Sequence, residues 1–439
     1  MVSPPLPARP PQESEYGRSL VRLLTYTWNM TTYSAVVTTG IYCRPGCSAR
    51  PLAQNTRTFE LAAAAEAAGF RACHRCRPYR AAGPVGSSPP EIVCEAVQLI
   101  IGGVLDNGGT EAALAEQVGM SPRHLRRLFL AHLGATPDQL ARSRRAHFAR
   151  RLLDDTDLTV LEVAFASGFG SLRQFNRTMQ EVFDDSPASL RGRRHRADRL
   201  AADGGLALRL PVTPDYDWAA VRSFLAARAI PGVEAVDGDT YRRTITVAGS
   251  PGLLEVSPGD AAGPAGGCLL LRAHLPYWEG LIHIVDRVAR VLGADADHAA
   301  DVAAVQADPV LGVLAATRSG SPVPGAWDPF EAGVWTILSA RPGHEQLLEK
   351  FVAQLGAPVP GLPGGLSHAF PDVTAVTQAD LAPAGLPEAE ASAIAVLAAT
   401  LSAGGTVRMN PGQWRPWLAL AATHLMAHGD GEHSVTVLA

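Results

Sequence analysis

Four cysteines near the amino terminus are the residues of this chain whose type and spacing best fit a chemical site. Cys43 and Cys47 form one close pair, and Cys73 and Cys76 form another. Two such pairs are what one tetrahedral zinc ion needs as ligands. A zinc-bound thiolate is also the nucleophilic form of cysteine at neutral pH. The spacing alone favours a purely structural zinc site, because structural zinc is the commoner of the two.

The segments that flank the cysteines favour the chemical alternative. Residues 38–42 read Thr-Thr-Gly-Ile-Tyr before the first pair, and residues 49–51 read Ala-Arg-Pro after it. Residues 68–71, Ala-Gly-Phe-Arg, precede the second pair. With these segments, residues 32–80 resemble the amino-terminal domain of the adaptive-response (Ada) alkylation-repair proteins. In that family a zinc thiolate removes methyl groups from DNA phosphotriesters.

The resemblance implies a role for each residue that matches the family's motif. Cys43 matches the methyl acceptor, and the implied reaction is stoichiometric because no simple step regenerates a thiolate from a thioether. Methylation of that sulfur would also remove one negative charge beside the DNA and so strengthen DNA binding. The other implied zinc ligands are Cys47, Cys73 and Cys76. The residues that match DNA-backbone contacts are Thr39, Arg50 and Arg71.

Two further segments have the pattern of a helix, a glycine turn and a second, capped helix. In the first, Gly119 lies in the turn and Ser121 caps the helix that follows. In the second, residues 168–170 form the turn, and a helix that ends in Phe183 follows Ser171. The recurrence of caps and glycine turns at matching places indicates two helix-turn-helix units.

Residues 91–192 as a whole resemble the DNA-binding domain of AraC/XylS-type regulators. The resemblance implies that the second helix of each unit enters a major groove. Arginine suits bidentate contact with guanine edges, and asparagine and glutamine suit adenine edges. A basic, solvated helix face is the alternative for any single arginine. The candidates for base or phosphate contact are Arg123, Arg126, Arg173, Gln174, Asn176 and Arg177.

The second half of the chain resembles bacterial alkyl-base DNA glycosylases. Residues 206–290 alternate apolar and polar residues in short segments, which predicts strands. Within them, residues 214–234 resemble the amino-terminal domain of those enzymes. Residues 327–338 resemble the opening of their helix-hairpin-helix domain, and residues 384–401 and 414–420 resemble two of its later helices.

The residues that carry glycosylase chemistry are missing from the sequence. The family's Gly-Ile-Gly hairpin and its catalytic aspartate belong between the last two of these helices, where residues 402–413 contain neither. Asp372 and Asp380 lie in another segment, and we expect them to be loop or helix-cap residues. We therefore expect a glycosylase-like fold that has lost catalysis. Its emptied cleft could instead bind a ligand or partner, and Trp327 and Trp335 suit either a stacking pocket or a core.

Charge and cysteine usage agree with this division. Residues 1–200 carry 25 Lys and Arg against 18 Asp and Glu, and residues 201–439 carry 13 against 24. The basic first half suits nucleic acid, because neutralised phosphates dominate such binding. Paired cysteines fit a reducing compartment and a metal. The two lone cysteines, Cys94 and Cys268, are expected to be small buried residues.

The chain shows no pattern of a membrane or secreted protein. No apolar run reaches the ~18 residues that a membrane span needs. Residues 1–30 lack the apolar segment of a signal peptide. We therefore expect a cytoplasmic protein with no membrane partner. A monomer is a separate expectation.

A chain of 439 residues is too long for one core. We expect a multidomain α+β protein with four domains. These are a four-cysteine zinc domain over residues 1–80, an all-α double helix-turn-helix domain over 91–192, a small α+β domain over 206–292, and a truncated helical domain of helix-hairpin-helix type over 293–439.

The predicted function is that of a DNA-alkylation sensor and transcriptional regulator. It would accept a methyl group on a cysteine bound to Zn²⁺ and then bind promoter DNA. Its expected partners are double-stranded DNA, as methylated backbone and as promoter, and RNA polymerase. Two alternatives stay open: a bifunctional repair protein with an active alkyl-base DNA glycosylase, and an AraC-type regulator of another pathway with only structural zinc.

Overall fold

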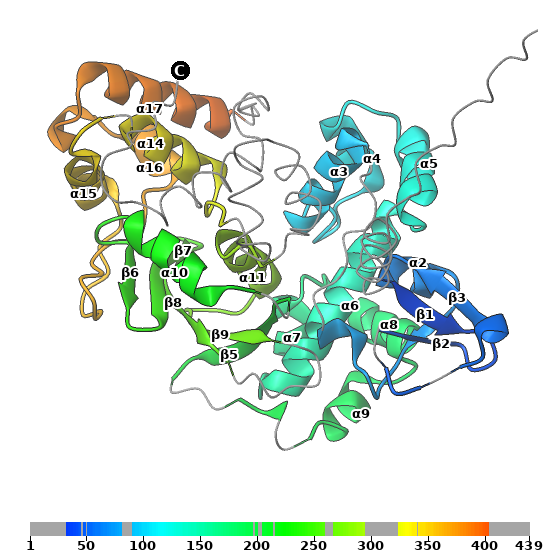
Figure 1. Ribbon diagram of the computed structural model, residues 1–439. Coiled ribbons are helices and arrows are strands. Elements are labelled where there is room, and N and C mark those ends of the chain that lie inside the picture. The colour runs from blue at the N-terminus through cyan, green and yellow to red at the C-terminus, as the bar shows by residue number, and fades with distance from the viewer. Residues whose placement is uncertain are drawn as a thin grey trace, which may run out of the picture.

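The computed structural model describes residues 32–44, 47–49, 51–80, 90–195, 198–200, 204–213, 216–259, 267–294, 324–339 and 341–403. Figure 1 shows its elements gathered around one long helix, α6 (Pro137–Asp155). A small blue module with the four cysteines lies on one side of α6, and a green sheet module lies on the other. Among the described helices, none is both long and apolar enough to cross a membrane.

The cysteine module, residues 32–80, is a small sheet with one helix against it. Its strands, in the spatial order β3-β1-β2-β4, are antiparallel except that β4 runs parallel to β2. Gly40 closes the turn between β1 and β2 with φ +65°, a conformation that favours glycine. The elements are β1 (Tyr33–Val36), β2 (Ile41–Cys43), β3 (Thr56–Phe59), α2 (Ala62–Ala67), β4 (Arg71–Ala72) and the 3₁₀ turns η2 (Ala53–Asn55) and η3 (Pro78–Arg80).

Two helix-turn-helix units, with α6 between them, make up residues 90–192. Ser121 and Ser171 each accept a hydrogen bond from a backbone N–H of the helix that follows, which confirms both predicted caps. The helix after Ser171 ends at Phe183, as predicted. The helices around α6 are α3 (Glu91–Ile101), α4 (Glu111–Gln117), α5 (Pro122–Leu133), α7 (Val160–Ala166), α8 (Leu172–Phe183) and α9 (Pro187–Gly192).

Helix α6 is the centre of the molecule because it is buried on several faces at once. A capping box of Thr136 and Gln139 starts it. It contacts α2 and η3 of the cysteine module, α3, α7, α8 and α9 of the helix-turn-helix units, and strand β5 of the sheet module. Its buried residues therefore include Arg145, Arg150 and Asp154 besides apolar ones.

The sheet module, residues 204–294, is a five-stranded antiparallel sheet with the order β5-β9-β8-β7-β6. Strands were predicted in the short alternating segments of residues 206–290, and the structure confirms them. The apolar side of α11 packs on the sheet and is buried at Leu281, Val285 and Val288. The elements are β5 (Leu206–Pro211), α10 (Trp218–Ala227), β6 (Glu234–Asp237), β7 (Thr240–Val247), β8 (Ser250–Pro258), β9 (Cys268–His274) and α11 (Leu281–Val291).

The helical module, residues 324–403, follows. Asp372 caps α16, and Asp380 lies in a loop and accepts a hydrogen bond from the Ala382 backbone, so the prediction of loop or helix-cap residues is confirmed. The predicted helix over residues 414–420 lies outside the described residues. The elements are α14 (Pro329–Ser339), α15 (His344–Leu355), α16 (Val373–Gln378), the 3₁₀ turn η5 (Ala382–Ala384) and α17 (Glu388–Ser402).

The apolar cores do not coincide with the four modules. One continuous core joins the cysteine module, the second helix-turn-helix unit and the sheet module, from Tyr33 through Phe183 to Leu271. The first helix-turn-helix unit, built from α3, α4 and α5, has a separate core around Leu114 and Phe129. The helical module has a third core. The molecule is thus one central body with two attached lobes.

The two lone cysteines are less buried than predicted. Cys94 is exposed and Cys268 is only half-buried. On α3 the core-facing positions are Val93, Ala96 and Ile100, so Cys94 lies away from the core. The prediction for Cys94 was wrong because it followed the usual burial of cysteine and ignored the helical period, which determines the side of α3 on which a residue lies.

Candidate metal centre and DNA-binding surface

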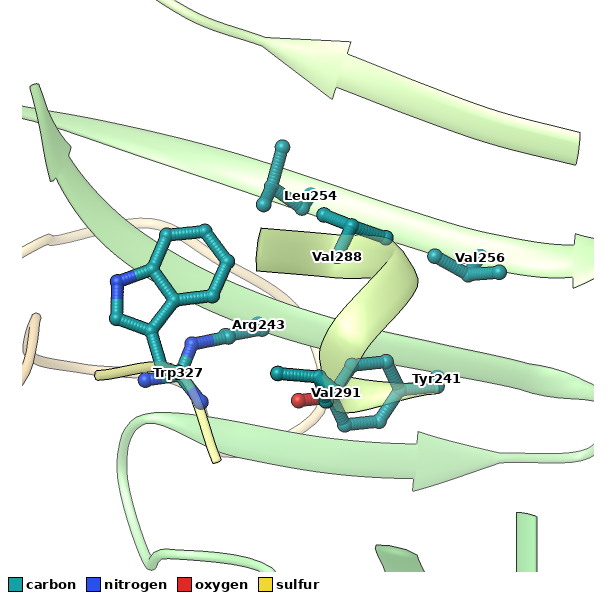
Figure 2. A pocket seen from close by; sticks show the side chains of 7 residues that line it. All are labelled: Tyr241, Arg243, Leu254, Val256, Val288, Val291 and Trp327. Carbon is teal, nitrogen blue, oxygen red and sulfur yellow. The ribbon is translucent and has the colours of Figure 1, made fainter. Parts of the chain in front are cut away.

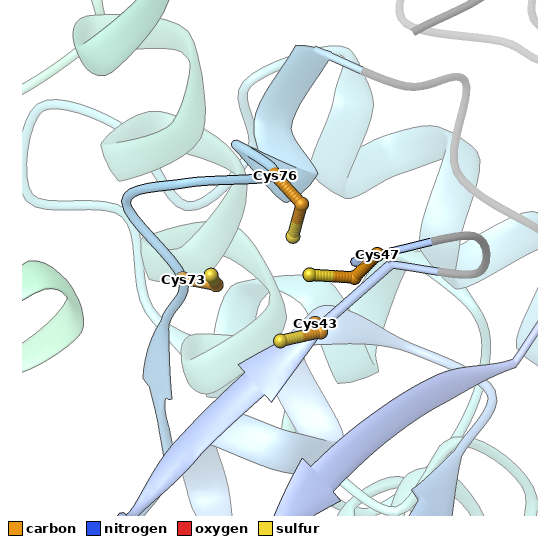
Figure 3. A group of neighbouring side chains, drawn as sticks. All are labelled: Cys43, Cys47, Cys73 and Cys76. Atoms are coloured by element: carbon orange, nitrogen blue, oxygen red, sulfur yellow. The ribbon is translucent and has the colours of Figure 1, made fainter. Parts of the chain in front are cut away.

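The four cysteine sulfurs form one cluster, in which their Sγ atoms all lie within 4.8 Å of one another. Figure 3 shows Cys43 at the end of β2 and Cys73 just beyond β4, with Cys47 and Cys76 facing them. The parallel pairing of β2 with β4 aligns Tyr42 with Ala72 and so brings the first cysteine of each pair together. A hydrogen bond of 3.0 Å from the Cys73 backbone N–H to the Tyr42 carbonyl fixes this alignment.

The cluster fits a zinc ion in size and in chemistry. Zn–S bonds of about 2.3 Å place tetrahedral sulfurs about 3.8 Å apart, within the observed limit. Without a cation the sulfurs compete for protons: hydrogen bonding to Cys73 raises the pKa of Cys43 well above its ordinary value. The same bond lowers the pKa of Cys73. Four sulfurs in contact all ionise only around a positive charge, which zinc supplies.

The four sulfurs differ in exposure. Cys43 and Cys73 are buried, with 6% and 9% of their surface exposed, whereas Cys47 and Cys76 are half-buried. The predicted methyl acceptor is therefore one of the two covered cysteines. An experiment that locates the methyl group has to distinguish Cys43 from its more exposed neighbours.

A polar and aromatic cluster joins this centre to helix α6. The hydroxyl of Tyr42, next to Cys43, donates to Glu66 at 2.7 Å and lies 3.0 Å from Nε2 of His147 on α6. That nitrogen also lies 2.7 Å from the Glu66 carboxylate. The His147 ring packs on Phe183, the last residue of α8, with ring centroids 5.8 Å apart. The cysteine centre is thus in continuous contact with the second helix-turn-helix unit.

The second cysteine pair is fastened to α6 as well. Arg77, directly after Cys76, has φ +48° and pairs with Asp198 at 2.7 Å and with Asp154 of α6 at 3.6 Å. Burial disfavours its charge, but the bond to Asp198 and the nearby carboxylates raise the pKa of Arg77. The Tyr79 hydroxyl donates to Asp154 at 2.9 Å. An unfavourable backbone conformation is held here by buried polar contacts.

The three predicted backbone contacts have different surroundings. Thr39 is exposed in the turn between β1 and β2. Arg71 lies on β4, half-buried, and its Nε is 3.9 Å from the carboxylate of Asp184 at the end of α8. Arg50 lies outside the described residues. The turn with Thr39 leads into β2, and β2 pairs with β4, which carries Arg71, so both residues belong to the sheet that carries Cys43.

We call α5 and α8, the second helices of the two helix-turn-helix units, the reading helices. The predicted contact residues on them are all exposed. On α5 the apolar side is buried at Leu125 and Phe129. On α8 Arg177 bonds to Glu181 of its own helix at 2.8 Å. Arg127 also lies on the exposed side of α5, beside His124, and belongs with the candidates although it was not singled out in the sequence. The exposed candidates are Arg123, Arg126, Arg173, Gln174, Asn176 and Arg177.

Trp327, one of the two tryptophans that were candidates for a stacking pocket, instead covers a buried ion pair. Figure 2 shows Trp327 against Arg243, whose guanidinium lies 4.8 Å from the ring centroid. Arg243 bonds to Glu234 at 2.8 Å and to Glu331 at 3.1 Å. The cavity beside them has room for about one water molecule. Trp327 is therefore a core residue at the junction of the sheet and helical modules.

Three family models match successive parts of the chain. The metal binding domain of Ada matches residues 27–79, a helix-turn-helix domain matches residues 114–193, and the AlkA N-terminal domain matches residues 207–328. Their order is the order of the modules in the structure.

Curated proteins match the same combination. A probable bifunctional transcriptional activator/DNA repair enzyme AlkA of Mycobacterium tuberculosis is 37% identical over 375 residues, which are 84% of this chain and 74% of that protein. The bifunctional transcriptional activator/DNA repair enzyme Ada of Escherichia coli K12 is 36% identical over 149 residues, 33% of this chain and 41% of that protein.

Solved structures match parts of the chain. The chain of a methylated N-ADA/DNA complex is 36% identical, with a TM-score of 0.11, and the match covers 30% of this chain and 100% of that one. A 3-methyladenine DNA glycosylase from Archaeoglobus fulgidus is 17% identical, with a TM-score of 0.36, over 48% of this chain and 69% of that one.

Proposed function

The chain belongs to the family of bifunctional transcriptional activators and DNA repair enzymes to which its mycobacterial relative belongs, and we propose that Cys43 is the residue through which it senses alkylated DNA. It is an alkylation-response regulator with a zinc-binding Ada module and an AraC-type DNA-binding unit. The observation that supports the role of Cys43 is its place at the end of β2, inside the four-sulfur cluster of a module that the Ada model matches.

In the proposed reaction the Cys43 sulfur attacks the methyl carbon of a DNA methyl phosphotriester. The new S–C bond forms as the O–CH₃ bond breaks, and the electron pair of that bond stays on the phosphate oxygen. The products are an ordinary phosphodiester and a methylated Cys43, so each chain reacts once. When bound, zinc supplies the charge that keeps the cysteine sulfurs deprotonated at neutral pH. The mass of the Cys43 peptide after incubation with methylated duplex DNA tests this proposal.

Methylation then favours promoter binding through electrostatics and position. It removes one negative charge from a module that lies against DNA phosphates, which lowers repulsion. Thr39, Arg50 and Arg71 are the proposed backbone contacts of that module. The contacts of His147 and Phe183 join the cysteine module to α8, the second reading helix. The cysteine module and α8 therefore bind DNA as parts of one body. RNA polymerase is the further partner that we propose for the DNA-bound, monomeric protein.

The reading helices are proposed to contact DNA through the exposed residues of α5 and α8. We expect Arg173→Ala to weaken binding to a promoter duplex by roughly tenfold, because one arginine contact to a base or phosphate is lost. Methyl uptake at Cys43 should be unchanged. Fluorescence anisotropy over a range of salt concentrations gives the affinity, and mass spectrometry gives the uptake.

The matched control for that variant is Arg272→Ala. Arg272 is exposed on β9 of the sheet module, so the substitution removes the same charge away from the proposed reading helices. It should leave promoter affinity within about twofold of the wild type, since only the distant field changes. Equal losses in both variants would mean that net charge, and not a contact by α8, accounts for the effect.

We propose that the glycosylase-like half releases no damaged bases. Residues 402–413, where the family's hairpin and aspartate belong, contain no aspartate and no Gly-Ile-Gly sequence. A folded preparation should release no methylated purine from alkylated DNA above the spontaneous rate, as measured by chromatography of free bases. Release that saturates with enzyme and is repeated over many turnovers would establish the bifunctional alternative.

A further inference from the structure

The first helix-turn-helix unit is joined to the rest of the molecule by helix α6, whose Ala141 belongs to its core, and by a small polar contact. Its core, around Leu114 and Phe129, is separate from the core that unites the cysteine module, the second unit and the sheet module. Its position relative to the second unit therefore depends on α6, which contributes residues to both cores, and on the groups at its border. A helix from the glycosylase-like half lies at that border.

The border contact is centred on His283 of α11. Its Nδ1 lies 3.0 Å from the carbonyl oxygen of Ile101, at the end of α3, and its Nε2 lies 2.8 Å from the carboxylate of Asp106. The other oxygen of Asp106 accepts a hydrogen bond of 2.8 Å from Arg145 of α6. Arg145 also donates to the Leu105 carbonyl at 3.1 Å. The Asp106 and Arg145 side chains are only 7% and 4% exposed, so water competes little for these bonds.

Two glycines allow this contact to pack closely. Gly103, in the first unit, has φ +95°, and a Cβ there would lie 2.8 Å from the ring of His283. Gly168, in the turn between α7 and α8, has φ +79°, and a Cβ there would lie 2.7 Å from the carboxylate of Asp106. One carboxylate thus contacts α6, α11 and the turn before the second reading helix. The contact, which we call the latch, consists of His283, Asp106 and Arg145.

The position of the first unit matters because two reading helices on one duplex have to match its helical repeat. Two units that bind successive turns of the major groove on the same side of a duplex must lie about 34 Å apart and keep a fixed orientation to each other. Helix α6 alone joins the two units along the chain, but the core of the first unit is separate. The latch adds a second connection through α11 and so fixes the angle between the units.

We propose that the glycosylase-like half of this chain acts as a strut that holds the first reading helix in register with the second, through His283 and Asp106 as positioning residues. The proposal rests on the proposed DNA reading by α5 and α8. It gives the carboxy-terminal half a part in promoter selection that needs no base-excision chemistry. The DNA that this arrangement fits is a two-part site whose halves lie at one defined spacing.

The test compares His283→Ala with a matched control on the same helix. Asp286 of α11 pairs with Arg144 of α6, so Asp286→Ala removes a neighbouring contact between α11 and α6 while His283, Asp106 and Arg145 all stay. The probe is a duplex of about 30 base pairs, long enough for two half-sites one helical turn apart, selected from random sequence by the wild-type chain. In a second duplex, the sequence of the half-site that α5 contacts through Arg123 is scrambled. In a third duplex, one base pair is inserted between the two half-sites.

The strut predicts that His283→Ala binds the intact duplex about tenfold more weakly than the wild type, because the second half-site is no longer presented at high effective concentration. On the scrambled duplex the two proteins should bind equally. The inserted base pair should weaken the wild type and Asp286→Ala much more than His283→Ala. Methyl uptake at Cys43 should be the same in all three.

Equal affinity and equal spacing dependence of His283→Ala and the wild type would overturn the strut. If His283→Ala fails to fold, Asp106→Asn keeps the shape of the side chain and should show the same changes to a smaller extent. The underlying function is tested separately. If Arg123→Ala and Arg173→Ala bind the intact duplex as tightly as the wild type does, the proposal that α5 and α8 contact DNA is wrong. If those two variants bind more weakly but His283→Ala does not, only the strut proposal is overturned.

Discussion

The Cys43→Ser variant is expected to take up no methyl group from methylated duplex DNA, whereas each wild-type chain takes up one. A serine hydroxyl is essentially un-ionised at neutral pH and is a far weaker nucleophile than a thiolate. The loss should therefore be complete on the time scale of the wild-type reaction. Intact mass and a peptide map after incubation with DNA that was methylated and then freed of reagent give the extent and the site of uptake.

Two matched variants make this result specific. Cys94→Ser removes an exposed thiol on α3, far along the chain from the cluster, and should leave uptake unchanged. Cys47→Ser removes a half-buried ligand while the proposed acceptor stays, so any methyl group that it takes up should still be on Cys43. A methyl group on Cys47 or Cys76 of the wild type would move the acceptor role to a more exposed sulfur.

An unmodified wild type that is folded and contains zinc would give the opposite conclusion. The zinc would then be structural, and the regulator would receive its signal elsewhere in the chain. Zinc content, measured by atomic absorption on each variant, separates loss of the acceptor from loss of the metal, because Cys43→Ser also removes a ligand.

Local features of this structure followed from the sequence. The cysteine spacing predicted the sulfur cluster, and the cluster forms because strands β2 and β4 end side by side. Serine residues before Pro122 and Leu172 predicted the starts of both reading helices, since a hydroxyl cap satisfies backbone N–H groups at the position where it stands. Each of these signals is contained within a few residues.

Contacts between distant segments could not be predicted in this way. His283 and Asp106 are brought together by the packing of α11 near α3, and nothing in the spacing of either residue marks the pair. Gly168 was visible as a turn residue, but only the structure shows that the missing side chains of Gly103 and Gly168 make room for the latch. The partners of Arg243 could not be predicted either. A charged residue at an inward position of a strand indicates a buried partner of opposite charge, but the sequence does not show which residue that is.

Removal of that arginine is the second change with a large expected effect. Arg243 is 2% exposed, and its partners Glu234 and Glu331 are 3% and 2% exposed. Arg243→Met leaves two buried carboxylates without their cation, which costs roughly 3–5 kcal/mol of the free energy of unfolding. Urea unfolding followed by tryptophan fluorescence measures the loss, since Trp327 packs on the guanidinium.

The neighbouring residue provides the matched control. Arg242 lies on the same strand, with its side chain 18% exposed, and pairs with Glu255 at 2.8 Å and with the exposed Asp237. Arg242→Met should cost at most about 1 kcal/mol, because solvent screens such pairs. Equal losses for the two variants would mean that the buried pair contributes no more than a surface pair.

The loss in Arg243→Met should also depend on pH in a direction that identifies its cause. Burial raises the pKa of Glu331 above its ordinary value even with Arg243 beside it, and removal of Arg243 removes an opposing effect. A carboxyl group with a higher pKa in the folded state binds more protons when folded, so its contribution is complete below its unfolded pKa of about 4.3 and is lost as pH rises through the folded pKa. The variant's deficit should therefore be smaller at about pH 5 than at about pH 8.

A deficit that does not change with pH would point to lost packing of the arginine side chain on Trp327 instead of unpaired charge. Adding Glu234→Gln and Glu331→Gln to Arg243→Met should then fail to restore stability, whereas unpaired charge predicts that it does.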